Sequence, residues 1–456
     1  MHGLIGRQLL FVCLVFPAVA WAQFDRRDRR DPALVLETGG RTAYCDALSF
    51  SDDGKFLLAA GDDKVVTVWN HGPAGLDARP AQVLRWPSWR EQRGAIYAMA
   101  LSPNDGGRRI AIGGYGMRTG TVAVLDRESG AVLHSDFTDE AVVITAIAFS
   151  ADGKRIAFGT GIGTVWIWDM QAKPMRLGQH QAANSRDENW VRLLRFRGDR
   201  LLSIAEDGKL VERDSKKPNE GTVILDLGLG MTVRAASLST DGKWLAAAMR
   251  GPTIAVRSLD GNKMDVSLPE GQFPMCVAFS ADGQRVAAGI NKLSAGTKFY
   301  VENGGSVNIY DLAAGEAKMV QQLPHSWRAE AVAWQGRERI AVAGGDNHEV
   351  KLWDLAKQEK PLSVVQGAGN CIWTVRLSDD GAHLLWQDRR DPNARHPNRR
   401  GDGPWKVFAL EDRKFLPQLP AKSKIVDPQD SAQGWRVVPD EKDSYVWHAL
   451  DPAGTQ

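Results

Sequence analysis

The sequence predicts an all-β protein built as a closed ring of eight small antiparallel sheets with four strands each. Three observations support this fold class. The phrase FSADGKRIAFG at 149–159 recurs as FSADGQRVAAG at 279–289. Apolar and polar residues alternate in short runs, which is typical of strands. An Asp-Gly pair separates two such runs in each phrase, and glycine takes the positive φ that a tight hairpin turn demands.

Eight copies of the repeat follow one another at a period of roughly 40 to 50 residues. The clearest copies read LSFSDDGKFLLAAG from Leu48, IAFSADGKRIAFGTGIGTVWIWD from Ile147 and VAFSADGQRVAAG from Val277. The other copies begin at Met99, Leu193, Ala236, Val332 and Val375. Because the copies are contiguous, we expect one large repeat domain.

Each copy contains the same elements in the same order. A first alternating run leads into the Ser-x-Asp-Gly turn, and a second run such as Arg155–Gly159 follows it. After a variable loop comes a third run such as Val165–Trp168, and then a looser fourth run such as Gly130–Phe137. The second runs are rich in Ala, Val, Ile and Gly, which indicates strands that neighbouring sheets cover on both faces.

The third runs carry a family resemblance. VWIWD ending at Asp169 and VKLWD ending at Asp354 are similar to the signature of WD40-repeat β-propellers, here of a degenerate, exported bacterial type. The resemblance covers residues 33–412 and implies a WD40-like β-propeller of eight blades, with seven blades plus an irregular unit as the alternative. The Gly-His pair that usually opens a repeat is missing, with only Gln179-His180 near such a place. The family's buried Asp-His-Ser-Trp network is therefore not assumed.

A ring is stable only if its ends are joined. The segment Ala33–Glu37 reads ALVLE and precedes the first full set of strands. In this family such a strand commonly completes the last blade, which here contains Val375–Leu410. We expect that pairing to remove the open sheet edges.

The two ends of the chain are expected to lie outside the ring. Arg7 precedes an apolar stretch, Leu9–Val19, and Ala20-Trp21-Ala22 supplies a cleavage site, so residues 1–22 are predicted to be a signal peptide. The stretch is short for a membrane helix, although an uncleaved anchor is the alternative. Cleavage would leave a charged tether at 23–32 and a periplasmic or secreted protein. The C-terminal extension at 413–456 is expected to contain a β-hairpin.

Composition argues against several binding classes. The chain has 57 Lys and Arg residues against 55 Asp and Glu residues, so no bulk charge would draw it onto nucleic acid. Cys45, Cys276 and Cys371 show no CxxC pair or metal-ligand spacing, although a single bridge stays open.

Known catalytic motifs are missing from the sequence. It contains no Gly-x-Ser-x-Gly, His-Glu-x-x-His, P-loop or EF-hand pattern. His348 lies near Asp346 and Glu349, but this cluster is expected to serve hairpin turns. We therefore expect no catalytic residue, no cofactor and no metal.

Loop lengths suggest which face of the ring binds. In propellers of this family, the loops that enter the first strands and those between second and third strands lie on one face, here called the loop-rich face. The Asp-Gly turns lie on the other face. Long loops at 115–120, 291–306 and 387–403 would fall on the loop-rich face, where recognition is usually placed.

Aromatic residues also point to this face, because they occur at or just before the starts of first strands, several with an arginine nearby. The predicted partner-binding residues are Tyr44, Trp89, Trp190, Phe273, Trp327, Arg328, Trp373, Arg389 and Arg390. Two alternatives remain open. The aromatic side chains would instead cap the blade cores, and the basic stretch 389–400, with its interleaved aspartates, would be a solvated loop.

Two functional hypotheses follow. The first is a monomeric, exported, non-enzymatic scaffold that binds a protein or peptide on the loop-rich face. The second is an exported propeller hydrolase or lyase with polar groups at the channel mouth. Broad aromatic and arginine contacts favour the first, and carboxylates or histidines converging in a pocket favour the second.

Overall fold

Every regular element in the described part of the chain is a β-strand. The computed structural model describes residues 40–425, except for 87–93, 117–119, 139, 141, 182–188, 229, 231, 295–300, 313–314, 346, 358–359, 368–373, 388–404 and 413, together with 436–439 and 447–450. No helix in these residues is long and apolar enough to cross a membrane.

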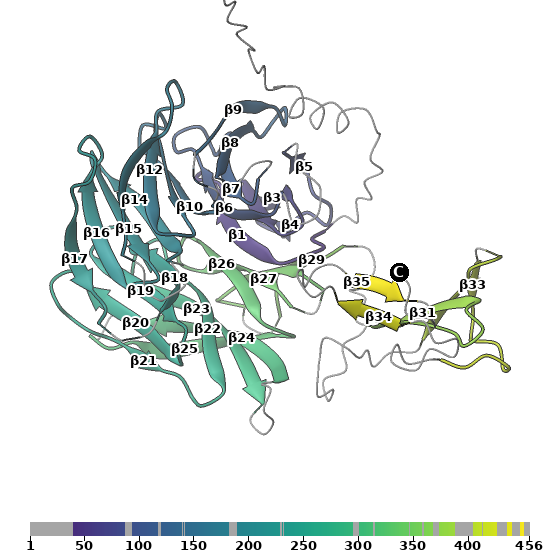
Figure 1. Ribbon diagram of the computed structural model, residues 1–456. Coiled ribbons are helices and arrows are strands. Elements are labelled where there is room, and N and C mark those ends of the chain that lie inside the picture. Colours follow the sequence, from purple (N-terminus) through teal and green to yellow (C-terminus); the bar gives the residue numbers. More distant parts are fainter. Residues whose placement is uncertain are drawn as a thin grey trace, which may run out of the picture. The chain divides into compact units, whose positions relative to one another are not determined.

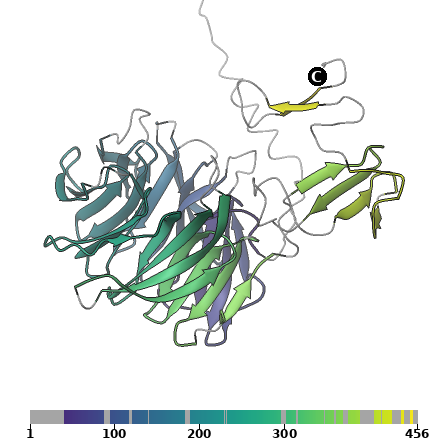
Figure 2. The same cartoon turned by 90° about the horizontal axis from the view of Figure 1, so that it is seen from below.

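The strands form antiparallel sheets that follow one another in chain order, coloured from purple to green in Figure 1 and seen from below in Figure 2. Seven of these sheets are numbered here as blades. Blade 1 comprises β1 (Cys45–Phe50), β2 (Phe56–Gly61), β3 (Val65–Gly72), β4 (Gly75–Leu76) and β5 (Gln82–Arg85). Blades 2 and 3 comprise β6 (Ile96–Leu101), β7 (Arg109–Gly114), β8 (Thr121–Asp126) and β9 (Val132–Phe137), then β10 (Ile144–Phe149), β11 (Ile156–Thr160), β12 (Thr164–Trp168) and β13 (Met175–Gln179).

The remaining blades have the same order of strands. Blades 4 and 5 comprise β14 (Val191–Arg197), β15 (Arg200–Ala205), β16 (Lys209–Asp214) and β17 (Thr222–Asp226), then β18 (Val233–Leu238), β19 (Trp244–Met249), β20 (Thr253–Ser258) and β21 (Val266–Ser267). Blades 6 and 7 comprise β22 (Gln272–Phe279), β23 (Arg285–Ser294), β24 (Val301–Asp311) and β25 (Lys318–His325), then β26 (Ala329–Gln335), β27 (Arg339–Gly344), β28 (Glu349–Asp354) and β29 (Ser363–Val365).

The seven blades close a ring, because each first strand contacts the first strand of the next blade and β26 contacts β1. A buried apolar cluster fills each of the seven interfaces between neighbouring blades. The closing cluster packs Cys45 and Leu57 of blade 1 with Ala341, Val350 and Leu352 of blade 7. Each blade is therefore covered on both faces by its neighbours.

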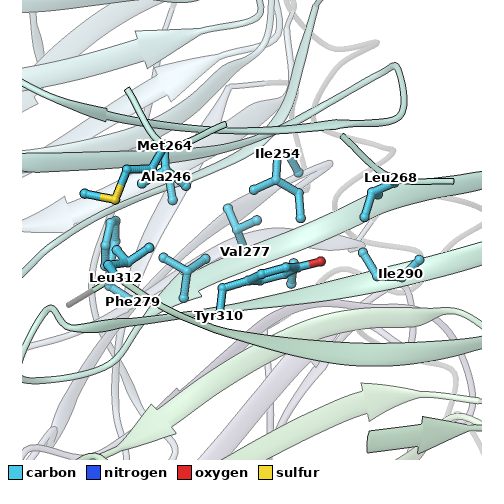
Figure 3. Close-up of a cluster of buried hydrophobic side chains, with 13 residues drawn as sticks. Ala246, Ile254, Met264, Leu268, Val277, Phe279, Ile290, Tyr310 and Leu312 are labelled. Atoms are coloured by element: carbon cyan, nitrogen blue, oxygen red, sulfur yellow. The ribbon is translucent and has the colours of Figure 1, made fainter. Parts of the chain in front are cut away.

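The second strands explain the small-residue runs in the sequence. Successive residues of a strand point to opposite faces. Accordingly Leu57 packs toward blade 7 and Leu58 toward blade 2. Figure 3 shows one interface, where Ile254 of blade 5 meets Val277 and Tyr310 of blade 6. A strand that lies between two other sheets has no exposed side and hence no polar alternation.

The predicted number of repeat units is confirmed, since an eighth four-stranded sheet follows blade 7. It comprises β30 (Thr374–Leu377), β31 (His383–Gln387), β32 (Lys406–Ala409) and β33 (Lys414–Leu416). The ring itself closes between blades 1 and 7. This agrees with the seven blades of the alternative, but the extra unit, expected there to be irregular, is a regular four-stranded sheet. The predicted closing strand at 33–37 lies outside the described residues. Blade 7 (β26–β29) and the eighth sheet (β30–β33) each already contain four strands without it.

Beyond the eighth sheet, residues 423–425 bind its Ser-x-Asp-Gly turn. The backbone N–H of Asp379 donates to the Lys424 carbonyl (2.9 Å), and Ser423 Oγ donates to Asp380 Oδ2 (2.7 Å). Farther along the chain, β34 (Arg436–Pro439) pairs antiparallel with β35 (Trp447–Leu450).

The Ser-x-Asp-Gly phrase forms the same hydrogen-bonded turn in blades 1, 3, 5 and 6 and in the eighth sheet. In blade 3, Ser150 Oγ donates to Asp152 Oδ1 (2.6 Å) and accepts from the backbone N–H of Arg155 (2.9 Å). Gly153 has a φ of 66°, which only glycine adopts without strain. The same serine-to-aspartate bond recurs at Ser51, Ser239, Ser280 and Ser378.

A variant of the family's buried network lies between blades 3 and 4, at the Gln179-His180 position. His180 Nδ1 lies 3.1 Å from Asp207 Oδ2, and its Nε2 lies 3.0 Å from Ser203 Oγ. Arg213 Nη1 donates to the same Ser203 oxygen (2.6 Å), so an arginine takes the place of the usual tryptophan. This network could not be predicted from the sequence, because its residues come from separate segments of the chain and no Gly-His pair marks them.

Candidate functional site

The first strands of all seven blades line a central cavity of about 670 Å³. Side chains from every blade meet at this cavity. Its lining combines aromatic, charged and apolar side chains. A cavity of this size is sufficient for several side chains of a partner or for a small ligand.

Each first strand contains a β-bulge at the same place. The strand ladder shifts between Cys45 and Ala47 in β1 and between Val233 and Ala235 in β18, for example. A bulge turns the side chain of its extra residue away from the regular alternation. The bulge residues of blades 1 to 7 all line the cavity, and they are, in order, Asp46, Tyr97, Thr145, Arg192, Arg234, Met275 and Glu330.

A recurring backbone hydrogen bond joins the loop before a first strand to the loop after the second strand of the same blade. The N–H of Asp62, just after β2, donates to the carbonyl of Tyr44, just before β1 (3.1 Å). Glu206 donates in the same way to Trp190 (3.1 Å). At Gly61 an added Cβ would lie 1.9 Å from the Tyr44 oxygen, so only glycine permits this approach. The two loop sets therefore share one face, as the family resemblance implied.

Carboxylates gather at the mouth where blades 1 and 7 meet. Glu330 Oε2 accepts from the Cys45 backbone N–H (2.8 Å) across the closing interface, and its Oε1 lies 3.7 Å from His348 Nδ1. Asp46 and Asp62 face the same cavity. Asp46 is exposed to the channel, but the channel walls partly desolvate its carboxyl group, and this desolvation, reinforced by the charge of Asp62, raises the pKa of Asp46 to about 7. This sector is rich in negative charge.

Arginines gather on the other side, at blades 4 and 5. Arg192 and Arg250 both pair with Glu206, whose side chain is 1% exposed; the Arg250 Nη2 to Glu206 Oε1 distance is 2.8 Å. Burial lowers the pKa of Arg234, and the positive charges of Arg250, Arg192 and Arg328 lower it further. Three guanidinium groups, those of Arg192, Arg234 and Arg250, therefore lie near the buried carboxylate of Glu206.

Two aromatic groups stand at the mouth with arginines over their rings. The Arg328 guanidinium lies 4.1 Å from the Tyr44 ring centre, and the Arg192 guanidinium lies 4.8 Å from the Trp190 ring centre. The Trp190 ring is in turn 5.9 Å from the Tyr97 ring. Such cation–π pairs hold both the arginine and the aromatic side chain in a fixed orientation.

The structure brings together three of the nine predicted partner-binding residues at the cavity, namely Tyr44, Trp190 and Arg328. Trp327 is only 4% exposed, and the Arg328 guanidinium lies 4.8 Å from its ring centre. Its position fits the alternative in which an aromatic side chain caps a blade core. Phe273 is half-buried in β22 and is not part of the cavity lining. Trp89, Trp373, Arg389 and Arg390 lie outside the described residues.

The bulge residues were missed by the sequence analysis, although a signal was present. In five of the seven blades the bulge residue stands five positions before the serine of the turn, as from Asp46 to Ser51 and from Arg234 to Ser239. In blades 4 and 7 the same spacing leads to Arg197 and Gln335. A comparison of the copies column by column would have found this position, because it varies in charge while its neighbours stay apolar. The sequence alone does not show that side chains at this position face the channel, because their direction depends on the bulge.

The cavity lining does not resemble a metal or disulfide site. In the described residues no group of three or more His, Cys, Asp and Glu side chains is arranged to hold a metal ion. Cys45 and Cys276 are buried free thiols in different blades, and burial raises the pKa of each to about 12. Both thiols are therefore uncharged and unreactive near neutral pH.

Comparisons with known proteins agree with this fold. The family described as WD domain, G-beta repeat, matches residues 34–70. The β-propeller domain of Cps50 (Swd1) from Myceliophteria thermophila superposes with a TM-score of 0.52 at 17% identity, covering 70% of this chain and 98% of that domain. At this identity the likeness shows the fold.

A relative among characterised proteins matches over a shorter part of the chain. U3 small nucleolar RNA-associated protein 12 of Saccharomyces cerevisiae is 20% identical over 256 residues. The match covers 55% of this chain and 22% of the yeast protein. The chain thus spans about a fifth of that relative's length.

Proposed function

Because the chain carries a WD40 repeat and folds as a β-propeller, we propose that it is an exported scaffold that binds a protein or peptide partner at the mouth of its central channel. Propellers of this family commonly mediate protein interactions and are typically not enzymes. The observation that supports the proposal most directly is the pair of aromatic–arginine groups around one cavity, at Tyr44 with Arg328 and at Trp190 with Arg192. Trp, Tyr and Arg are the side chains most enriched at interface hot spots.

The test replaces aromatic side chains at the mouth. Trp190→Ala and Tyr44→Ala are each expected to weaken partner capture by at least about tenfold, since truncation of a hot-spot residue costs about 2 kcal/mol or more. Capture is measured by pull-down from the native cell envelope and then with the purified partner. The matched control is Trp244→Ala, a half-buried tryptophan at the start of β19, beside the Asp-Gly turn of blade 5.

Wild-type capture by both mouth variants, while each retains the wild-type circular dichroism spectrum, would refute this binding face. Loss of capture in the Trp244 variant alone would place the partner on the opposite face.

Export is supported by Arg7, the apolar stretch Leu9–Val19 and the small residues at Ala20 and Ala22. Expression of the full chain in cells with a periplasm, followed by N-terminal sequencing of the product, is expected to give a mature chain that begins at Gln23. A product that retains the apolar stretch in the membrane fraction would support the uncleaved anchor instead.

A hydrolase or lyase is the second candidate, and one observation favours it. Asp46, Asp62 and Glu330 converge at the same mouth, and the pKa of Asp46 is raised to about 7. A carboxyl group with such a pKa can act as a general acid or base near neutral pH. Turnover of a panel of chromogenic esters and glycosides by the wild type, lost in Asp46→Asn, would establish this candidate in place of the scaffold.

A further inference from the structure

The charges at the channel mouth are divided between two sides of the ring. The bulge residues of blades 7 and 1, which are adjacent, are Glu330 and Asp46. Those of blades 4 and 5, also adjacent, are Arg192 and Arg234. In a ring of seven, blade 4 lies opposite the junction of blades 7 and 1. The neutral bulge residues Tyr97, Thr145 and Met275 separate the two sides.

The basic side has more positive charge than its own carboxylate neutralises. Glu206 already pairs with Arg192 and Arg250. Arg234 lies in the field of three other arginines, and its Nε is buried without a hydrogen-bond partner among the described residues. A buried donor that stays unsatisfied is costly. The guanidinium of Arg234 is therefore a favourable place for a carboxylate from outside.

The acidic side has the opposite imbalance. Asp46 is open to the solvent of the channel, and the nearest charged groups around it are Asp62, Arg41, Glu330 and Asp63. Arg41 is buried and bonded to Asp63 Oδ1 (3.0 Å) and to the Tyr44 carbonyl (2.7 Å). The Arg328 guanidinium also lies at this junction, over the Tyr44 ring, so two arginines stand against four carboxylates, those of Asp46, Asp62, Asp63 and Glu330. A cationic side chain placed between Asp46 and Asp62 would relieve their mutual repulsion.

We propose that the channel mouth binds a partner segment in which an acidic and a basic side chain lie close together. The acidic side chain binds Arg234 and Arg192, and the basic side chain binds Asp46 and Asp62. This inference rests on the proposed function and names the chemistry of the partner. A segment whose charges all have the same sign would be attracted to one side of the mouth and repelled by the other. The divided mouth therefore selects a segment that carries both charges.

The test uses short acetylated and amidated peptides, so that terminal charges do not contribute. Three sets contain glutamate only, lysine only, or glutamate and lysine separated by alanine spacers of increasing length, in both orders. Affinity for the full-length mature chain is measured by isothermal titration calorimetry at low salt. The mixed peptides are expected to bind at least about tenfold more tightly than either single-sign set.

Two variants assign the charges. Arg234→Gln and Asp46→Asn are each expected to weaken the best mixed peptide by at least about tenfold. In addition, Arg234→Gln should improve the relative binding of the lysine-only peptide, and Asp46→Asn that of the glutamate-only peptide. The matched controls are Arg176→Gln on β13 and Asp136→Asn on β9, which remove the same charges from fourth strands away from the cavity.

Equal affinity for all three sets, or unchanged affinity in both mouth variants, would overturn the inference. Tighter binding of a single-sign set would overturn it as well. If Trp190→Ala abolishes partner capture while the charge variants do not alter it, the proposed function stands and this inference fails. If neither kind of variant alters capture, both fail.

Discussion

At the residue scale, the bulge position of the first strand determines what the channel mouth presents. The backbone there is the same in all seven blades, but the side chain changes from Asp46 to Tyr97 to Arg192. The residues on either side of the bulge are constrained by the packing between blades and stay apolar. Variation is tolerated at the bulge because that side chain points into the solvent of the channel rather than into a core.

Asp46 gives the first prediction, on stability against pH. Its folded pKa of about 7 lies above that of an unfolded aspartate, near 3.9. The folded chain therefore binds this proton more tightly, and stability is lost as pH rises from about 4 to about 7, with no further loss above. Asp46→Asn carries no charge, so it should unfold at a higher temperature than the wild type at about pH 8 and at the same temperature at about pH 4.

The expected gain in free energy of unfolding is about 1 kcal/mol, because solvent in the channel screens the repulsion around this exposed side chain. Thermal melting followed by circular dichroism at several pH values measures it. Asp136→Asn, on the outer strand β9, is the control. A gain of equal size at both pH values would show that Asp46 is charged throughout the range.

At the element scale, the Ser-x-Asp-Gly hairpin is the unit that the sequence repeats. The serine hydroxyl joins the two strands, and the aspartate carboxylate accepts from the backbone two residues later, as Asp152 does from Lys154 (3.0 Å). The hydrogen bond from Ser150 is the largest cause that lowers the pKa of Asp152. This contribution to stability is present above the unfolded pKa and is lost as pH falls through the lowered one.

Ser150→Ala is the corresponding prediction. The variant removes the bond to Asp152 and leaves the Arg155 N–H without its acceptor, so the free energy of unfolding should fall by about 1–2 kcal/mol. Urea unfolding at neutral pH measures this loss. In the control Ser135→Ala, at an exposed position of β9, the free energy of unfolding should fall by much less. Equal losses in both variants would rule out the turn as the cause.

At the scale of the whole molecule, ring closure depends on contacts between the two ends of the blade series. Blade 1 packs against blade 7 through one apolar cluster and the hydrogen bond from Cys45 N–H to Glu330. All seven interfaces are filled without residues 374–456. The eighth sheet is therefore not needed to close the ring.

Truncation tests this arrangement. A mature chain that ends at Gly367 is expected to melt cooperatively, with a midpoint within about 4 °C of the full chain, because no interface between blades is lost. Differential scanning calorimetry measures the midpoint. If the truncated chain is unfolded, the eighth sheet belongs to the ring, and the prediction of eight blades in the ring would be restored.

The repeat, the four-strand unit, the Asp-Gly turns and the two-sided second strands were all determined by the sequence, because each depends on local patterning and recurs many times. Tyr44, Trp190 and Arg328 stand at fixed positions relative to the first strand, and the structure has all three in the cavity lining. Trp327 was not distinguished from them, because burial depends on what packs over a side chain.

Only the tertiary structure decided three features. Closure between blades 1 and 7 depends on contacts between residues almost 300 positions apart, as from Cys45 to Glu330, which no local pattern records. The seven bulges follow from strand pairing, and they select one side chain per blade for the channel. The division of charge across the mouth follows from both, because Arg192 and Arg234 face Asp46 and Glu330 only once the ring is closed.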